Sequence, residues 1–173
     1  MKKIFFAVVA ALSMTQLHAG YDGHFQLSVF SPGELPASSY TIRGLRLSCL
    51  YGQCEEFYGL DVGMAGTVRG YMYGVQANAL WNDVGADAYG LQVACVNYVK
   101  GDFVGGQIGL VNVVDSDVYG FQGGVYNHAS GCVRGLQLGV MNWSKDLAGC
   151  QIGLANIVTD RSWSVWPIVN IGW

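Results

Sequence analysis

Apolar and polar residues alternate along most of the chain, in a phrase that recurs about every fifteen residues. The clearest copies read GLQLGVMN from Gly135 and GCQIGLAN from Gly149. In each copy the glycines and the glutamine share one parity and the aliphatic residues share the other, which is typical of a strand with two unlike faces. A helix needs apolar spacings of three and four, and each glycine would cost it about 1 kcal/mol. The pattern therefore predicts strands rather than helices.

The same phrase is repeated through most of the sequence. Earlier copies, some of them blurred, begin at Gly44, Gly59, Gly74, Gly90, Gly105 and Gly120. Short breaks rich in Asp, Ser, Gly and Lys separate the copies at residues 100–102, 115–117, 129–131 and 144–146. These are turn-forming residues, so one strand region and one polar turn make up each repeat. An internal repeat of this kind must be explained by the architecture as a whole.

The favoured architecture is all-β, an up-and-down antiparallel β-barrel of about ten strands of the outer-membrane type. Breaks of about three residues suit tight hairpins, and single-chain bacterial barrels have an even number of strands. The expected strands lie near residues 25–31, 42–51, 57–66, 71–81, 89–99, 103–114, 118–128, 132–143, 147–158 and 163–173. In this arrangement the last strand closes the barrel against the first.

The alternative architecture is a β-solenoid with one coil of about fifteen residues per repeat. Its coils would turn Leu, Leu, Val and Asn inward, and the recurrent Asn would stack as a ladder. The repeat length favours it, because alternate barrel strands run in opposite directions and would suit a repeat of twice this length. Against it, a coil needs at least two corners and each repeat shows one clear turn.

The chain divides into a targeting segment and a single β domain. Residues 1–19 combine Lys2 and Lys3 with an apolar run and a small residue at position 19, which predicts a secretory signal peptide. Residues 20–173 form the domain, with repeats at about 44–158 and a closing strand at 163–173. We therefore expect an exported protein of the bacterial outer membrane or cell surface.

The closing strand reads WSVWPIVNIGW and alternates to the final residue. Val169, Ile171 and Trp173 share one parity. The segment resembles the C-terminal strand signal of bacterial outer-membrane proteins, in which an aromatic residue ends an alternating strand. The resemblance implies that the barrel-assembly machinery and outer-membrane lipid are the partners of this chain.

The repeats as a set resemble a bacterial family of exported surface-repeat proteins built on GLQxGLxN units of about fifteen residues. The resemblance covers roughly residues 40–173, including the closing PIVNIGW. It implies surface location and repeat architecture, and it carries no chemistry.

The glutamine parity is expected to face a narrow barrel interior, where amides hydrogen-bond one another and glycines leave room. The predicted lumen-facing amides are Gln76, Gln92, Gln107, Gln122, Gln137 and Gln151. Leucine positions such as Leu138 would then face lipid. In the early repeats Arg46 and Asp61 replace the amide, and they are either an ion pair inside the lumen or two unrelated solvated charges. Tyrosines beside the phrases, such as Tyr58 and Tyr119, would form girdles at the membrane interfaces.

Composition supports export to an apolar environment. The chain is 51% hydrophobic and 12% charged, about half the usual charged share. Loss of Lys2 and Lys3 takes the formal charge from −3 to −5, which makes nucleic acid a poor partner. Of the five cysteines, Cys49 and Cys54 are close enough in sequence to form a disulfide across a turn. The sequence contains no CxxC pair, so a zinc site is weakly supported.

No motif for catalysis, a metal or a cofactor occurs in the sequence. His24 and His128, the histidines outside the targeting segment, stand in different repeats, and the Asp residues of the breaks are expected to form turns. The predicted role is therefore non-enzymatic, with an unidentified ligand or none. It is a small outer-membrane or surface barrel with a structural, anchoring or narrow-pore role. The alternative is an exported surface-repeat solenoid that acts as an adhesin or binding module.

Overall fold

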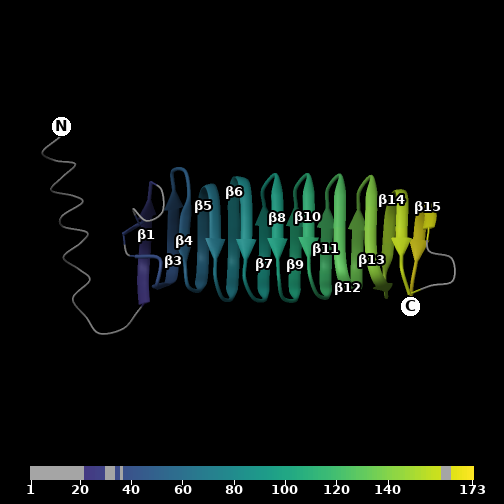
Figure 1. Cartoon of the computed structure of the whole chain (residues 1–173), viewed down its shortest axis with the longest axis horizontal. Helices are drawn as coiled ribbons and strands as arrows, with labels where there is room; N and C mark the ends of the chain where they lie inside the picture. The colour runs from purple at the N-terminus through teal and green to yellow at the C-terminus, as the bar shows by residue number, and fades with distance from the viewer. Residues whose placement is uncertain (1–21, 30–33, 36, 161–164) are drawn as a thin grey trace, which may run out of the picture.

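Successive repeats stack as the coils of a flattened β-solenoid of about nine turns. The computed structural model describes residues 22–29, 34–35, 37–160 and 165–173. Its strands are β1 (Asp22–Ser28), β2 (Glu34–Leu35), β3 (Thr41–Ser48), β4 (Gly52–Cys54), β5 (Phe57–Val68), β6 (Met72–Val84), β7 (Ala88–Val93), β8 (Val96–Val99), β9 (Phe103–Ile108), β10 (Val111–Val114), β11 (Val118–Gly123), β12 (Tyr126–Leu138), β13 (Met141–Leu147), β14 (Cys150–Val158) and β15 (Val165–Ile171). Figure 1 shows these strands side by side along the long axis. Among the described residues no helix is long and apolar enough to span a membrane.

Each coil pairs with the next through parallel strands in which equivalent residues face each other. Gly120 and Gln122 of β11 lie opposite Gly135 and Gln137 of β12. Within the described residues, antiparallel pairs join only β1 to β2 and β14 to β15. The predicted antiparallel barrel is therefore wrong, and the alternative solenoid is the observed architecture. The reason is that the sequence repeats with the length of one coil. When neighbouring strands run in the same direction, each position of one repeat lies opposite the same position of the next repeat.

The two ends of the chain do not meet. β1 pairs with β2 and β3, whereas β15 pairs with β14. Figure 1 shows β1 and β15 at opposite ends of the solenoid, so closure of the last strand on the first is also wrong. The expected signal peptide, residues 1–19, lies outside the described residues.

Each coil has two sides joined by two corners. In the coil of residues 118–132, β11 forms one side and the first part of β12 forms the other. We call the stack that contains β7, β9 and β11 the first sheet, and the stack that contains β8 and β10 the second sheet. The polar breaks form one corner, and a Gly-aliphatic step such as 124–125 forms the other. Each strand expected between residues 42 and 158 therefore contains a corner.

The second corner turns both amides of the repeat inward. Gln122 and Asn127 are five residues apart, so an uninterrupted strand would place them on opposite faces. Both are fully buried, as are Val118 and Ala129 nearer the polar corner. The aliphatic residues that the solenoid alternative placed inside lie outside instead. The apolar part of the core consists of Ile42, Cys54, Phe57, Val68, Met72, Val84, Ala88, Val99, Phe103, Val114, Val118, Ala129, Val133, Leu147 and Val158.

The first glycine of the phrase is required by the backbone. In seven repeats it has a φ between +131° and +148°, a region that residues with a Cβ rarely adopt. A Cβ on Gly120 would also lie 2.1 Å from the carbonyl oxygen of Gly105 in the preceding coil. The glycine column therefore lets the coils approach closely on the first sheet.

Candidate binding surface

The six glutamines predicted to face a lumen form one ladder inside the solenoid. All are fully buried between the two sheets, where no lumen exists. Gln122 Nε2 donates to Gln107 Oε1 at 2.8 Å, and Gln137 Nε2 donates to Gln122 Oε1 at 2.7 Å. The same bond links the other neighbours, so every amide donates toward the N-terminal end. The glutamine ladder comprises Gln76, Gln92, Gln107, Gln122, Gln137 and Gln151.

A second ladder, of asparagines, faces the first and runs in the opposite direction. Asn112 Nδ2 donates to Asn127 Oδ1 at 2.8 Å, and this bond is repeated toward the C-terminal end until Asn156. From Asn82 to Asn142 each amide also donates to a corner carbonyl of the next coil, as Asn112 does to Gly123 O at 3.0 Å. Asparagine is short enough to reach this corner, which explains its place in the phrase. The asparagine ladder comprises Asn82, Asn97, Asn112, Asn127, Asn142 and Asn156.

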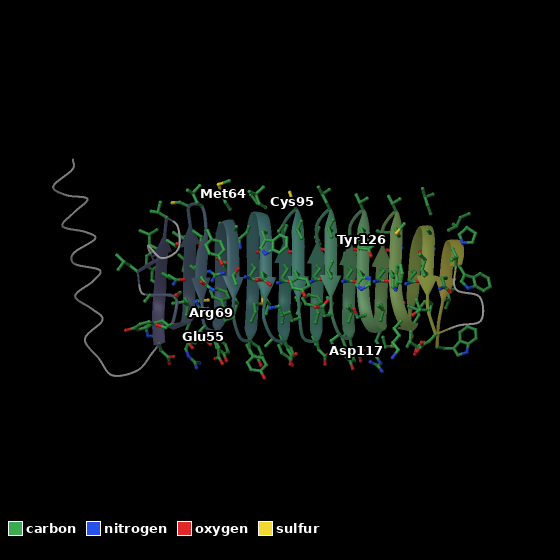
Figure 2. The ribbon with its side chains drawn as sticks, viewed as in Figure 1. Glu55, Met64, Arg69, Cys95, Asp117 and Tyr126 are labelled. Atoms are coloured by element: carbon green, nitrogen blue, oxygen red, sulfur yellow. The ribbon has the colours of Figure 1, made fainter. Side chains whose placement is uncertain are left out.

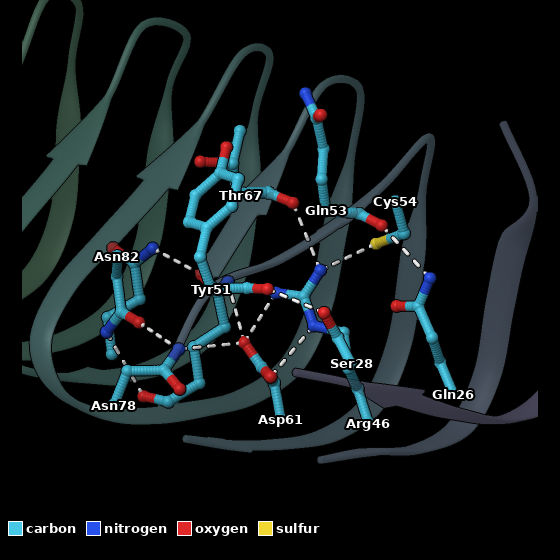
Figure 3. A network of polar contacts seen from close by, with 12 residues as sticks. Gln26, Ser28, Arg46, Tyr51, Gln53, Cys54, Asp61, Thr67, Asn78 and Asn82 are labelled. Atoms are coloured by element: carbon cyan, nitrogen blue, oxygen red, sulfur yellow. Dashed lines mark hydrogen bonds and ion pairs between the residues drawn. The ribbon is translucent and has the colours of Figure 1, made fainter. Parts of the chain in front are cut away.

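The glutamine ladder ends on a buried ion pair between Arg46 and Asp61 (Figure 3). The expected pairing of these residues is confirmed, but the pair lies in the packed interior of the solenoid and not in a barrel lumen. Arg46 Nε donates to Asp61 Oδ1 at 2.8 Å and Nη2 donates to Oδ2 at 2.5 Å. Gln76 and Asn78 donate to the same carboxylate at 3.2 and 2.9 Å. The Arg46 Nη1 atom donates to Cys54 Sγ and to the Thr67 carbonyl, each at 3.0 Å.

Charges in this cluster are tightly held. Although burial disfavours the charged guanidinium, Cys54 and Asp61 together raise the pKa of Arg46 above its ordinary value. Burial raises the pKa of the Cys54 thiol to about 11, and nearby Arg46 opposes that rise. Because Arg46, Cys54 and Asp61 are all completely buried, a solute cannot reach them. The cluster is therefore structural, and a binding site must lie on the outside.

The outer surface has one apolar edge, formed where the Gly-aliphatic corners stack. Its aliphatic members are 38% to 74% exposed. Figure 2 shows Met64 and Cys95 projecting from the upper edge of the solenoid. The apolar edge comprises Leu50, Met64, Leu80, Cys95, Leu110, Val125, Val140 and Leu154.

Apolar side chains continue from this edge onto both sheets. On the first sheet the adjoining row carries Val62, Ile108, Leu138 and Ile152, which are exposed. On the second sheet the adjoining positions include the exposed Trp81 and Met141 and the half-buried Tyr126. The result is a continuous apolar strip, and exposed apolar patches larger than a few hundred Å² usually mark interaction sites.

The opposite edge is charged. The polar breaks stack there, and Figure 2 shows Glu55, Arg69 and Asp117 along the lower edge. Asp117 Oδ1 accepts the Cys132 backbone N–H at 2.7 Å, which lowers the pKa of Asp117 and ties one coil to the next. The charged edge comprises Glu55, Glu56, Arg69, Asp87, Lys100, Asp102, Asp115, Asp117, Lys145, Asp146 and Asp160.

Tyrosines line the first sheet beside the charged edge. The rings of Tyr58 and Tyr73 stack at 4.9 Å, and those of Tyr73 and Tyr89 stack at 4.7 Å. The Arg43 guanidinium covers the end of the stack, 4.6 Å from the centroid of Tyr58. The expected pair of girdles is therefore wrong, because these tyrosines form one row along the solenoid. The faces of Tyr58, Tyr73 and Tyr89 cover one another in this stack.

The three residues of the predicted assembly signal lie on β15 at the C-terminal end. Val169, Ile171 and Trp173 are all exposed. With Trp166 and Asn170 they line an open hollow of about 520 Å³. None of these five side chains is titratable, so the described lining of the hollow supplies no side chain that could act as an acid or base. In this fold β15 pairs with β14 and covers the last coil. The three residues therefore do not close a barrel.

The remaining candidates for chemistry stay apart. Cys49 and Cys54 are both free, as are the other three cysteines, so the suggested bridge across the turn is absent. His24 lies on β1 and His128 on β12. In the part of the chain that the structure describes, no group of three or more His, Cys, Asp or Glu residues is placed to hold a metal ion.

Comparison with known proteins gives no relative: no family model, no curated protein and no solved structure matches this chain. The family resemblance of the repeats therefore remains an expectation from the sequence. Sequence reasoning missed the apolar edge as a unit, although the uncharged Gly-aliphatic step before each Asn was the signal for it.

Proposed function

We propose that this protein is an exported surface-repeat β-solenoid that acts as an adhesin or binding module through its apolar strip. The observation that carries the proposal is the in-register repetition of the exterior. One apolar side chain from each of the stacked corners projects at the same edge, and neighbouring rows extend the strip onto both sheets. Exposed Leu110, Val125 and Leu154 contribute nothing to the buried core, so their apolar character serves something outside the molecule.

Binding through the strip is tested on a surface of known chemistry. The purified domain, residues 20–173, is expected to be retained on a phenyl matrix at moderate salt. The variant L110Q/V125Q/V140Q should elute much earlier, because it interrupts the edge at three consecutive coils. A matched variant of the charged edge, E55Q/K145Q/D160N, should be retained as the wild type is. Passage of the wild type through the matrix without retention would contradict the proposal.

Export is the second part of the proposal and is tested separately. Residues 1–19 fused to a reporter enzyme that is active only outside the cytoplasm should give activity. Deletion of residues 2–19 from the full chain should leave the protein inside the cell. Equal export with and without this segment would show that another signal directs the protein.

A further inference from the structure

We infer that the ligand of the apolar strip is a phospholipid bilayer, on which the solenoid lies with its apolar edge among the acyl chains nearest the headgroups. The inference rests on the proposed function, because it names the ligand class of the same surface. Proteins that lie on a membrane bury an apolar face about 5–10 Å deep and keep a polar face in water. The two edges of this solenoid have that division.

Charge is segregated across the width of the molecule. The corner segments of the apolar edge, such as residues 109–112 and 124–127, contain no Asp, Glu, Lys or Arg in any of the eight repeats. Most of the described charges lie at the opposite edge or, like Arg134, in the row next to it. Arg46 and Asp61 are buried against each other. A bilayer can therefore receive the apolar edge without desolvating a charge.

The backbone of the apolar edge is also suited to an apolar phase, where an unsatisfied polar group costs several kcal/mol. In the corner at residues 124–126, Gly124 N donates to Leu138 O at 2.9 Å, and the N–H groups of Val125 and Tyr126 both donate to Leu110 O. The next corner repeats this pattern at Gly139, Val140 and Met141. The asparagine ladder donates a second hydrogen bond to such corner carbonyls, as Asn127 does to Leu138 O. These N–H groups need no water.

Aromatic side chains flank the edge at the depth where an interface would lie. Trp81 is exposed and follows Leu80 directly, while Tyr51 and Tyr126 follow Leu50 and Val125. Trp and Tyr are favoured at membrane interfaces because one part of the ring is apolar and the other is polar.

The shape of the strip favours lipid over a second copy of the chain. The edge is convex and one side chain wide, and eight coils at the usual strand spacing make it roughly 34 Å long. A flat, rigid protein partner that touched the edge row alone would bury a narrow line, well below the roughly 800 Å² that each partner contributes to a stable interface. Acyl chains adapt to a convex edge and cover its full length.

Flotation with vesicles tests the inference. The domain of residues 20–173 is mixed with phosphatidylcholine vesicles and centrifuged through a density gradient. Wild type should float, and L110Q/V125Q/V140Q should lose at least about tenfold in vesicle affinity. E55Q/K145Q/D160N should float as the wild type does. Because no cation lies on the edge, added phosphatidylglycerol and high salt should change binding little.

Each of the other outcomes contradicts the lipid inference, and one of them also contradicts the proposed function. If wild type does not float but self-associates by light scattering, and the triple edge variant does not, the occupant is a second copy and the lipid inference is wrong, while the proposed function stands. If wild type is monomeric, does not float and is not retained on the phenyl matrix, both are wrong. If the edge variant floats as well as wild type with an unchanged circular dichroism spectrum, lipid binding lies elsewhere on the molecule.

Discussion

The interior of the solenoid is built in two ways, one near each end. From the coil of Gln76 onward, a glutamine of the first sheet faces an asparagine of the second. In the earlier coils the ion pair of Arg46 and Asp61 replaces two glutamines, and Gly52 and Gly66 occupy the asparagine column. We call the coils that contain Arg46 and Asp61 the charged section and the coils with a buried Gln and Asn the uniform section. Both sections keep the same parallel register, so they differ only in their side chains.

The contrast shows first that volume is conserved across the interior. A Cβ on Gly66 would lie 2.6 Å from both Arg46 Nη2 and Asp61 Oδ2. The larger arginine occupies space that an asparagine side chain fills in later coils. Close packing makes such compensation necessary, because neither overpacking nor a void is tolerated cheaply.

The contrast also explains why the two ladders point in opposite directions. A carboxylate only accepts hydrogen bonds, so Gln76 must turn its N–H toward Asp61, and each later glutamine follows. At the other end, Asn156 donates to the carbonyl oxygen of Trp166 at 3.1 Å, which turns the asparagine ladder toward the C-terminal end. The buried ion pair therefore sets the direction of the glutamine ladder, and the last strand, β15, sets that of the asparagine ladder.

The largest loss of stability is expected for Asp61→Asn, which removes one partner of the ion pair in the charged section. The variant leaves the Arg46 guanidinium charged and buried with no counter-ion. Breaking a buried pair in this way should lower the free energy of unfolding by about 3–5 kcal/mol. Equilibrium urea unfolding followed by circular dichroism measures the loss.

The matched control is Glu55→Gln, which removes a carboxylate from an exposed pair with Arg69 at 3.7 Å. It should change the free energy of unfolding by less than about 1 kcal/mol. A loss in Asp61→Asn no larger than this control would mean that the buried pair contributes nothing measurable.

The second change interrupts the uniform section. Gln122→Leu keeps a similar volume but leaves the buried Gln107 Oε1 without its donor, and it leaves the buried Gln137 Nε2 only the Trp143 carbonyl, at 3.3 Å, as acceptor. The two lost hydrogen bonds should together cost about 2–4 kcal/mol. The exposed Val125→Gln in the same coil is the control and should stay within about 0.5 kcal/mol of wild type. Equal stability of the two variants would show that the ladder is not a source of stability.

The third change extends the uniform section into the charged one. The double variant R46Q/D61Q removes both buried charges and supplies the next amides of the ladder. Replacing a complete buried ion pair is often neutral or stabilising, although the smaller glutamine leaves space beside Gly66. We expect stability within about 2 kcal/mol of wild type, well above Asp61→Asn. A double variant as unstable as Asp61→Asn would show that volume matters more than charge in this section.

The repeat, the absence of helices and the polar corners could be predicted because they depend on local sequence. Period-two alternation and turn residues recur in every copy, and the structure places strands and corners there. The inward position of residues such as Gln122 also follows from the alternation, since glycine neighbours leave room on that parity.

Local alternation could not decide between barrel and solenoid. Both contain the same alternating segments, and they differ in whether neighbouring strands run antiparallel or parallel. The deciding feature was the second corner. It consists of a glycine and an aliphatic residue such as Val125, with no polar turn residue, because Asn112 and Asn127 bond the corner carbonyls from inside. The odd separation of Gln122 and Asn127 was the available sign that two buried amides lie on either side of a bend.

The edge that we propose as a binding surface was not predicted for a related reason. An edge residue such as Leu154 has the same place in the alternation as Leu138, which the barrel prediction turns toward lipid. Alternation distinguishes inside from outside, but it does not separate a flat sheet from a corner. Only the stacking of coils brings these corners into one line and places the charges on the other.

The smallest expected effect separates the two sections by their response to pH. The Cys54 thiol belongs to the charged section, where burial raises its pKa from 9.0 to about 11. Between these values the unfolded chain releases the thiol proton and the folded chain keeps it, so the free energy of unfolding falls as pH rises. The contribution between pH 9 and pH 10 is about 1 kcal/mol. Cys54→Ser, which does not ionise in this range, should lose that part of the slope, whereas Cys49→Ser at an exposed position should keep it. Urea unfolding at pH 8, 9 and 10 gives the three slopes, and identical slopes in wild type and Cys54→Ser would assign the alkaline loss to groups outside the charged section.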